Sequence, residues 1–155
     1  AQQMPFYTRD TIQDIIDTEV GVSDWVIVTQ DMINQFAELT GDPVEIHTNE
    51  ELARQTPFGG TIAHGLLTLS MIGGFVTATE VLMEGVTMGV NYGFNKVRFM
   101  APVKTGSRIR GRFTLRAAEE KSPGQWITTM DVVIEIEGEE KPAAIAEWLG
   151  MQFTG

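Results

Sequence analysis

Residues 65–83 read GLLTLSMIGGFVTATEVLM, the longest apolar stretch of the chain. The stretch is about long enough to cross a bilayer, but it contains several threonines, a serine, Glu80 and the pair Gly73-Gly74. A helix buried in a soluble core explains this mixture better than a transmembrane segment does. The stretch therefore predicts a central buried helix over this range.

The sequence after this helix is typical of strands. Runs rich in β-strand formers lie near residues 89–99, 107–118, 125–137 and 143–153. Turn signals separate them, at the Ala101-Pro102 pair, at residues 122–124 and at residues 138–142. We expect four antiparallel strands here.

The sequence before the central helix carries mixed signals. Residues 1–20 predict a short N-terminal helix, with Asp10 or Thr11 as its cap, and residues 25–28 a strand. Thr29 is suited to cap a helix that ends at Gly41, and Thr48 or Asn49 to cap a second, short helix.

These elements predict a single domain over residues 1–155, with residues 1–20 as a helical extension. One early strand, a central helix and four later strands give an α+β fold in which an antiparallel sheet wraps around a central helix. That architecture is the hotdog fold.

Composition excludes several classes of function. The chain has 155 residues, is 43% hydrophobic and carries a net charge of −10, which argues against binding to nucleic acid or to an anionic membrane. It has no cysteine, so it has no disulfide framework and no thiolate nucleophile. Its two histidines are too few for a polyhistidine metal centre, although a metal site with one histidine-and-carboxylate ligand set stays open. We expect no metal and no cofactor.

The N-terminus lacks the pattern of a secretory signal, and we expect a cytoplasmic protein.

The basic residues are concentrated in one segment. Residues 96–121 carry a net charge of +6, and the rest of the chain carries −16. The alternation of arginines with apolar residues from Arg108 to Arg116 predicts a solvated strand face, paired across strands with Asp131, Glu135 and Glu137. The alternative is a basic surface that receives an anionic ligand.

Asp42 and His47 are candidates for acid–base chemistry. Their spacing would not place them on one face of a regular helix, so a bend at Pro43 is needed to bring them together. A carboxylate beside an imidazole suits proton transfer near neutral pH, because histidine titrates there and the carboxylate fixes its tautomer. The alternative is an aspartate that caps a turn and a surface histidine.

The glycine-rich loop GGTIAHG, residues 59–65, follows this pair. It leads into the central helix, and the unpaired amides at the start of a helix, Gly65 foremost, can point at negative charge that develops on an oxygen. The alternative is a tight connection into a buried helix.

Residues 36–75, FAELTGDPVEIHTNEELARQTPFGGTIAHGLLTLSMIGGF, resemble the hydratase motif of the MaoC-like dehydratases, also called (R)-specific enoyl-CoA hydratases. Family members have an aspartate, four intervening residues and a histidine, followed about ten residues later by FGxxIAHGxL. Asp42 and His47 match the first part, and residues 58–67 match the second. The similarity extends over most of residues 20–112.

The resemblance implies a homodimer of single hotdog domains that needs no cofactor. It implies reversible syn addition of water to a trans-2-enoyl thioester of CoA or of acyl carrier protein, which gives the (R)-3-hydroxyacyl thioester. Asp42 and His47 would bind the catalytic water, and the Gly65 amide would donate to the thioester carbonyl. His64 matches a motif histidine that is usually structural.

The chain also departs from the family pattern. Many members have Asn-Pro where this chain has Val44 and Glu45, and some have a supporting serine where it has Gly73. Ser70, one turn earlier, is a possible substitute, although a serine inside a helix more often binds its own backbone.

Two further expectations concern the substrate and the assembly. Lys96, Arg98 and Lys104 lie toward strand ends and are the candidate contacts for CoA phosphates. A lone sheet leaves an open edge, which predicts a C2 dimer joined through the strand near residues 89–99. The rival functions are a hotdog thioesterase and a non-catalytic acyl-binding or assembly subunit.

Overall fold

The protein, seen in a computed structural model that describes residues 6–155, is built on a strongly curved antiparallel sheet. The four strands expected after the central helix are all present and are confirmed to within a few residues. They are β5 (Val86–Phe99), β6 (Arg108–Ser122), β7 (Gln125–Ile136) and β8 (Ala144–Thr154).

Two short N-terminal strands complete this sheet. β2 (Thr18–Val22) and β3 (Val26–Ile27) both pair with β6, so the sheet has six strands in the order β2-β6-β7-β8-β5, with β3 also beside β6. The strand predicted at residues 25–28 is therefore confirmed as β3. β5 forms the edge of the sheet farthest from β2.

The central helix is confirmed, but it is shorter than predicted. It consists of α4 (Gly65–Ser70), α5 (Ile72–Phe75) and the 3-10 turn η2 (Val76–Ala78). Thr79 has extended backbone, and Leu82–Met83 form strand β4, which pairs in parallel with β1 (Phe6–Tyr7). The expected extension to residue 83 is wrong, because the chain there leaves the helix to make this second, two-stranded sheet.

The N-terminal helical extension predicted over residues 1–20 is also largely wrong; residues 1–5 lie outside the described part. Only η1 (Ile12–Ile15) is helical, as a 3-10 turn, and the Thr11 side chain gives it no cap hydrogen bond. Residues 18–22 belong to the sheet instead, since Val20 is buried against the core there. Tertiary packing has overridden a weak local preference.

Three helices precede the glycine-rich loop. In α1 (Gln30–Thr40), the Thr29 hydroxyl accepts a hydrogen bond from the Met32 amide, and Gly41 ends the helix in the left-handed conformation, as predicted. α2 (Glu45–Thr48) is a one-turn helix that follows the bend expected at Pro43. α3 (Glu50–Ala53) is capped by Asn49.

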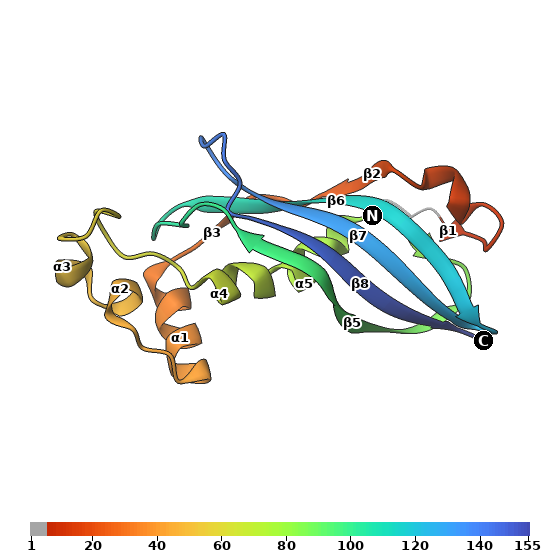
Figure 1. Cartoon of the computed structure of the whole chain (residues 1–155), viewed down its shortest axis with the longest axis horizontal. Helices are drawn as coiled ribbons and strands as arrows, with labels where there is room; N and C mark the ends of the chain where they lie inside the picture. Colours follow the sequence, from red (N-terminus) through yellow and green to blue (C-terminus); the bar gives the residue numbers. More distant parts are fainter. Residues whose placement is uncertain (1–5) are drawn as a thin grey trace.

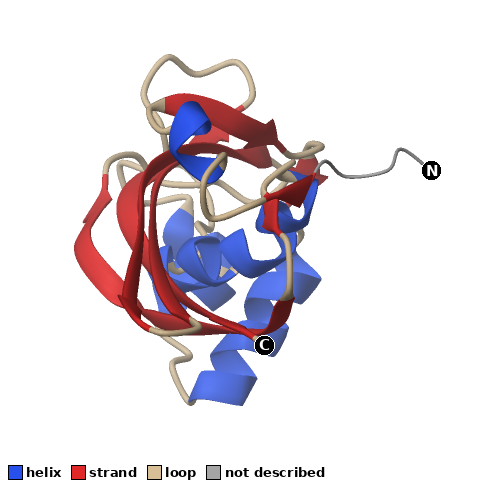
Figure 2. Cartoon of the chain, turned by 90° about the vertical axis from the view of Figure 1, so that its right-hand side faces the viewer, coloured by secondary structure: helices blue, strands red, loops and turns tan. Residues whose placement is uncertain are grey.

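The sheet curls around the central helix, as Figures 1 and 2 show. Its concave face carries fully buried side chains such as Phe113, Ile109 and Ile134, which share one apolar core with Phe75 and Ile72 of the helix. This is the predicted α+β hotdog arrangement. Within residues 6–155 no helix is long and apolar enough to cross a membrane.

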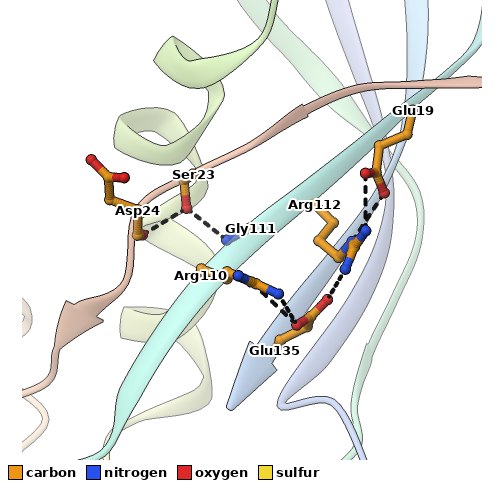
Figure 3. A network of polar contacts seen from close by, with 7 residues as sticks. All are labelled: Glu19, Ser23, Asp24, Arg110, Gly111, Arg112 and Glu135. Carbon is orange, nitrogen blue, oxygen red and sulfur yellow. Dashed lines mark hydrogen bonds and ion pairs between the residues drawn. The ribbon is translucent and has the colours of Figure 1, made fainter. Parts of the chain in front are cut away.

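The outer face of the sheet carries the predicted cross-strand ion pairs (Figure 3). Arg112 contacts Glu19 at 2.9 Å and Glu135 at 3.0 Å, and Arg110 contacts Glu135 at 3.1 Å. Arg108 and Arg116 also have acidic partners, Glu137 for the first and Asp17 and Asp131 for the second. The arginines of β6 therefore belong to a ladder of ion pairs on a solvated strand face.

Candidate active site

A cavity of about 290 Å³ lies where α2, the start of α4 and the segment after β5 meet. His47 and Gly65, both singled out in the sequence, line it together. The rest of the lining is mainly apolar and includes Phe58, Ala63, residues 99–103 and Ala143. An apolar cavity with few polar groups is the usual form of a small-molecule site.

The ring of His47 is held by a main-chain carbonyl. Its Nδ1 lies 2.7 Å from the carbonyl oxygen of Ile62. Because a carbonyl only accepts, Nδ1 carries the proton, and Nε2 of the neutral ring keeps its lone pair. The expectation that the Asp42 carboxylate fixes this tautomer is wrong, since the Ile62 carbonyl already does so.

His64 joins the two predicted site residues. It is only 3% exposed, and its Nε2 donates to the main-chain oxygen of Asp42 at 2.9 Å. Its ring stacks on that of His47, with centroids 3.9 Å apart, and Phe36 lies against it at 5.0 Å. The two histidines thus have opposite tautomers, because each donates to a carbonyl through a different nitrogen.

Asp42 is positioned by the end of α1. Its amide donates to the carbonyl of Ala37 at 2.9 Å, just after the left-handed Gly41. The side chain of Asp42 is half-buried, and the residue is not part of the lining of the His47 cavity. The structure therefore brings Asp42 and His47 to a common neighbour, His64, with the bend at Pro43 between them.

Gly65 begins α4 at the wall of the cavity. The first amide of a helix has no acceptor within that helix, and the Gly65 amide meets none elsewhere in residues 6–155. A Cβ at this position would lie 3.0 Å from the ring of Phe99, so any larger residue here would require that ring to move.

Sequence comparison identifies the family. Residues 11–136, most of the chain, match the family described as "MaoC like domain". The chain belongs to the MaoC-like dehydratase family. This confirms the resemblance of the motif over residues 36–75. Relatives named as dehydratases and hydratases confirm the expected class of enzyme, the hydro-lyases, which add or remove water.

Three proteins similar to this MaoC-like domain match it along most of their own length. It is 46% identical to "Nodulation protein N" of Rhizobium leguminosarum bv. viciae over 135 residues, which cover 86% of this chain and 84% of the relative. It is 44% identical to "3-hydroxyacyl-thioester dehydratase Z" of Mycobacterium tuberculosis strain H37Rv over 129 residues, 83% of this chain and 85% of the relative. The solved MaoC-like dehydratase of Rhodospirillum rubrum shares the fold, with a TM-score of 0.73 at 23% identity over 93% of this chain and 97% of that one.

Ser70 lies apart from the His47 cavity of the MaoC-like domain. Its hydroxyl donates to the carbonyl of Leu66 at 2.6 Å, the outcome expected for a serine inside a helix. It lines a different cavity, of about 420 Å³, together with Gly73, Phe94 and Trp148. A Cβ at Gly73 would meet nothing within 4 Å, so this cavity is open at that position.

Lys96, Arg98 and Lys104 are exposed and form no ion pair within residues 6–155. Arg98 and Lys104 flank the segment 99–103 that lines the cavity. Lys141 is likewise unpaired in the described part and lies two residues before Ala143, another lining residue. Sequence reasoning missed Lys141 because it lies outside the basic segment.

Sequence reasoning also missed the groups that hold His47. Ile62 acts through its main-chain oxygen, so its side chain carries no signal. Gln30 donates through Nε2 to the main-chain oxygen of His47 at 2.8 Å.

The hydroxyl and amide of Thr61, followed by Arg54, hold the pKa of the nearby Glu50 below its ordinary value, although burial acts in the opposite direction.

Proposed function

We propose that this protein catalyses the reversible syn hydration of a trans-2-enoyl thioester of CoA or of acyl carrier protein to the (R)-3-hydroxyacyl thioester. The observation that carries the proposal is one apolar cavity that holds both the imidazole of His47 and the start of α4 at Gly65. The first is a group for proton transfer, and the second is an amide donor to a thioester carbonyl.

The proposed chemistry balances with one water molecule. The oxygen of the water bonds to C3 of the substrate while the Asp42–His47 pair takes one of its protons. Nε2 of neutral His47 is suited to accept that proton, because Nδ1 is committed to the carbonyl of Ile62. The pair then returns a proton to C2, so the enzyme is unchanged after turnover.

The Gly65 amide has the second role in the proposal. Addition at C3 moves negative charge onto the thioester oxygen, as in an enolate. A donor that is fixed before the reaction stabilises this charge without reorganisation, and losing one such donor typically costs about 10²–10³ in rate.

One assay tests the proposal. A short trans-2-enoyl-CoA is incubated with the purified protein, and the loss of enoyl absorbance, the release of free thiol and the configuration of the product are followed together. We expect loss of the enoyl group, no thiol release and an (R)-3-hydroxyacyl product. Thiol release would instead identify a thioesterase. If neither loss of the enoyl group nor thiol release is seen, the protein is an acyl-binding or assembly subunit. Either result contradicts the proposal.

A further inference from the structure

A polar network contacts the main chain of His47, and its three residues are not among those that line the His47 cavity. It joins Gln30 at the start of α1, Thr61 in the glycine-rich loop and Thr105 between β5 and β6. Thr61 and Thr105 lie 31 and 75 positions from Gln30 along the chain. Thr61 is only 1% exposed, and Gln30 and Thr105 are half-buried, so the network is a part-buried link between three segments that reach the site.

The hydrogen bonds determine which way the Gln30 amide faces. Nε2 lies 2.8 Å from the main-chain oxygen of His47, which can only accept, so this end of the amide is the donor. Oε1 then faces the hydroxyls of Thr61, at 2.5 Å, and of Thr105, at 3.2 Å. The amide of Gln30 is therefore a bridge from the backbone of His47 to the loop that contains Thr61.

The hydroxyls of Thr61 and Thr105 each have one proton to donate. The acceptors near them are Oε1 of Gln30, a carboxylate oxygen of Glu50 that lies 3.0 Å from the Thr61 hydroxyl, and the main-chain oxygen of Thr61, 3.2 Å from the Thr105 hydroxyl. Because the two hydroxyls also lie 2.7 Å apart, Thr105 can donate to Thr61 while Thr61 donates to Gln30. This chain of two hydrogen bonds couples Thr105, Thr61 and Gln30.

The same loop also holds the imidazole ring of His47. Ile62, next to Thr61, accepts from Nδ1 of His47 through its carbonyl, and its amide donates to the carbonyl of Ile46 at 3.2 Å. The Thr105 amide donates to the carbonyl of Thr61 at 3.0 Å. Gln30 thus holds the main chain of His47, and Ile62 holds its ring. Thr61 connects these two contacts, because it bonds to Gln30 and precedes Ile62 in the chain.

We propose that Gln30, together with Thr61 and Thr105, is a positioning residue that holds His47 in the Nδ1–H tautomer with Nε2 directed to the substrate. This inference rests on the proposed function, but its structural half, the orientation of His47, can be measured without any substrate. A rigid tether matters for catalysis because small misplacements of a reacting group lower the rate steeply.

The test compares four variants of the full-length protein. Gln30→Leu removes the donor to the His47 carbonyl, and Thr61→Val removes the hydroxyl with little change of shape. Thr61→Ser restores the hydroxyl and is the rescue variant. Thr79→Val is the matched control, because Thr79 is a similarly buried threonine, 5% exposed, beyond the other end of the central helix.

Each variant is measured in two ways. Steady-state kinetics with a short trans-2-enoyl-CoA give kcat and KM, and imidazole nitrogen NMR gives the tautomer of each histidine. The chain has only two histidines, so their signals can be assigned by comparison with His47→Gln.

We expect Gln30→Leu and Thr61→Val to lower kcat about tenfold or more, with KM changed less than about twofold. Their His47 signals should shift from the Nδ1–H tautomer toward a mixture, while Thr61→Ser and Thr79→Val stay close to the wild type. A loss of kcat with unchanged His47 signals, or wild-type behaviour of both variants, would overturn the inference. If one of the two variants does not fold, the other alone decides.

Failure of the proposed function would look different. In that case the wild-type protein itself would not hydrate the enoyl thioester, and the NMR comparison would still show whether Gln30 and Thr61 control the tautomer of His47.

Discussion

At the scale of single residues, main-chain atoms set the chemistry of this site. The carbonyl of Ile62 fixes the tautomer of His47, and the carbonyl of Asp42 accepts from His64. Substituting the side chain of Asp42 or His47 therefore leaves the main-chain contacts of the same residue in place. This separation makes the two side chains suitable for a test of catalysis that does not disturb folding.

The first prediction concerns this pair. Asp42→Asn and His47→Gln should each lower kcat by at least about 10²-fold, because each removes a group that moves a proton in the reaction. Circular dichroism should show an unchanged fold, since the hydrogen bonds to the carbonyls of Asp42 and His47 remain possible. Asp31→Asn, on the exposed face of α1, is the control. Near wild-type turnover in either variant would remove that residue from the mechanism.

At the scale of helices and strands, β6 shows how the charged face of the sheet contributes to stability. Arg112 forms two hydrogen bonds of 2.9 Å with the carboxylate of Glu19. These bonds, helped by the charges of Arg112 and Arg110, hold the pKa of Glu19 below its ordinary value, although burial acts in the opposite direction. A carboxyl group whose pKa is lower in the folded state stabilises the fold above its unfolded pKa, and this contribution disappears as the pH falls through the folded pKa.

The second prediction follows from this linkage. Glu19→Gln should lower the free energy of unfolding by about 0.5 kcal/mol near neutral pH, the range for exposed ion pairs, because both side chains are about 40% exposed. The difference from the wild type should shrink as the pH falls below about 4 and as salt is added. Urea unfolding of both proteins at fixed concentration measures it. Glu38→Gln on α1 is the control, because Glu38 forms no ion pair within residues 6–155. A difference that grows in acid would contradict this account.

The elements differ in how far the sequence predicts them. β6 and β7 alternate apolar and charged residues, and the cap at Thr29 and the stop at Gly41 are local signals, so these parts follow from pattern alone. β2 was missed because its pairing depends on β6, about ninety residues away, and not on its own composition. The catalytic candidates came from motif spacing. Their supports, the Ile62 carbonyl and the Gln30 amide, left no pattern, because they act through contacts that only the folded chain creates.

At the scale of the whole molecule, charge distribution bears on how a CoA thioester would bind. The net charge of −10 repels phosphates, so binding needs a local positive surface. Seven of the eleven basic residues are engaged in ion pairs: Arg9, Arg54, Arg108, Arg110, Arg112, Arg116 and Lys121. The other four basic residues form no ion pair within residues 6–155, and three of them are the predicted phosphate contacts Lys96, Arg98 and Lys104.

The third prediction is therefore kinetic. Replacing Lys96, Arg98 or Lys104 by glutamine should raise KM for a CoA substrate and leave kcat nearly unchanged, and the effect should be larger at low than at high salt. Arg110→Gln is the control, because Arg110 is already paired with Glu135 and should hardly change KM. An unchanged KM for all three variants at low ionic strength would move the phosphate site elsewhere.

The last prediction concerns the assembly, and it starts from the free edge of the sheet. β5 is a 14-residue edge strand that pairs only with β8 among the described strands. Its side chains include the large apolar residues Met88, Val90 and Tyr92, which are 52%, 44% and 58% exposed. A long, apolar edge of this kind is normally paired or covered, because its free backbone groups and apolar side chains otherwise promote aggregation.

We therefore expect a C2 dimer in which the β5 strands of two copies lie side by side, and sedimentation should give twice the mass of the 17.1 kDa chain at micromolar concentration. Val90→Lys should shift the equilibrium to the monomer, because a charge on an edge strand opposes strand pairing. Ile27→Lys is the matched control: Ile27 is 51% exposed but lies on β3, beside the opposite edge. A wild-type protein that sediments as a monomer would refute the dimer, and a Val90→Lys variant that still dimerises would place its interface away from β5.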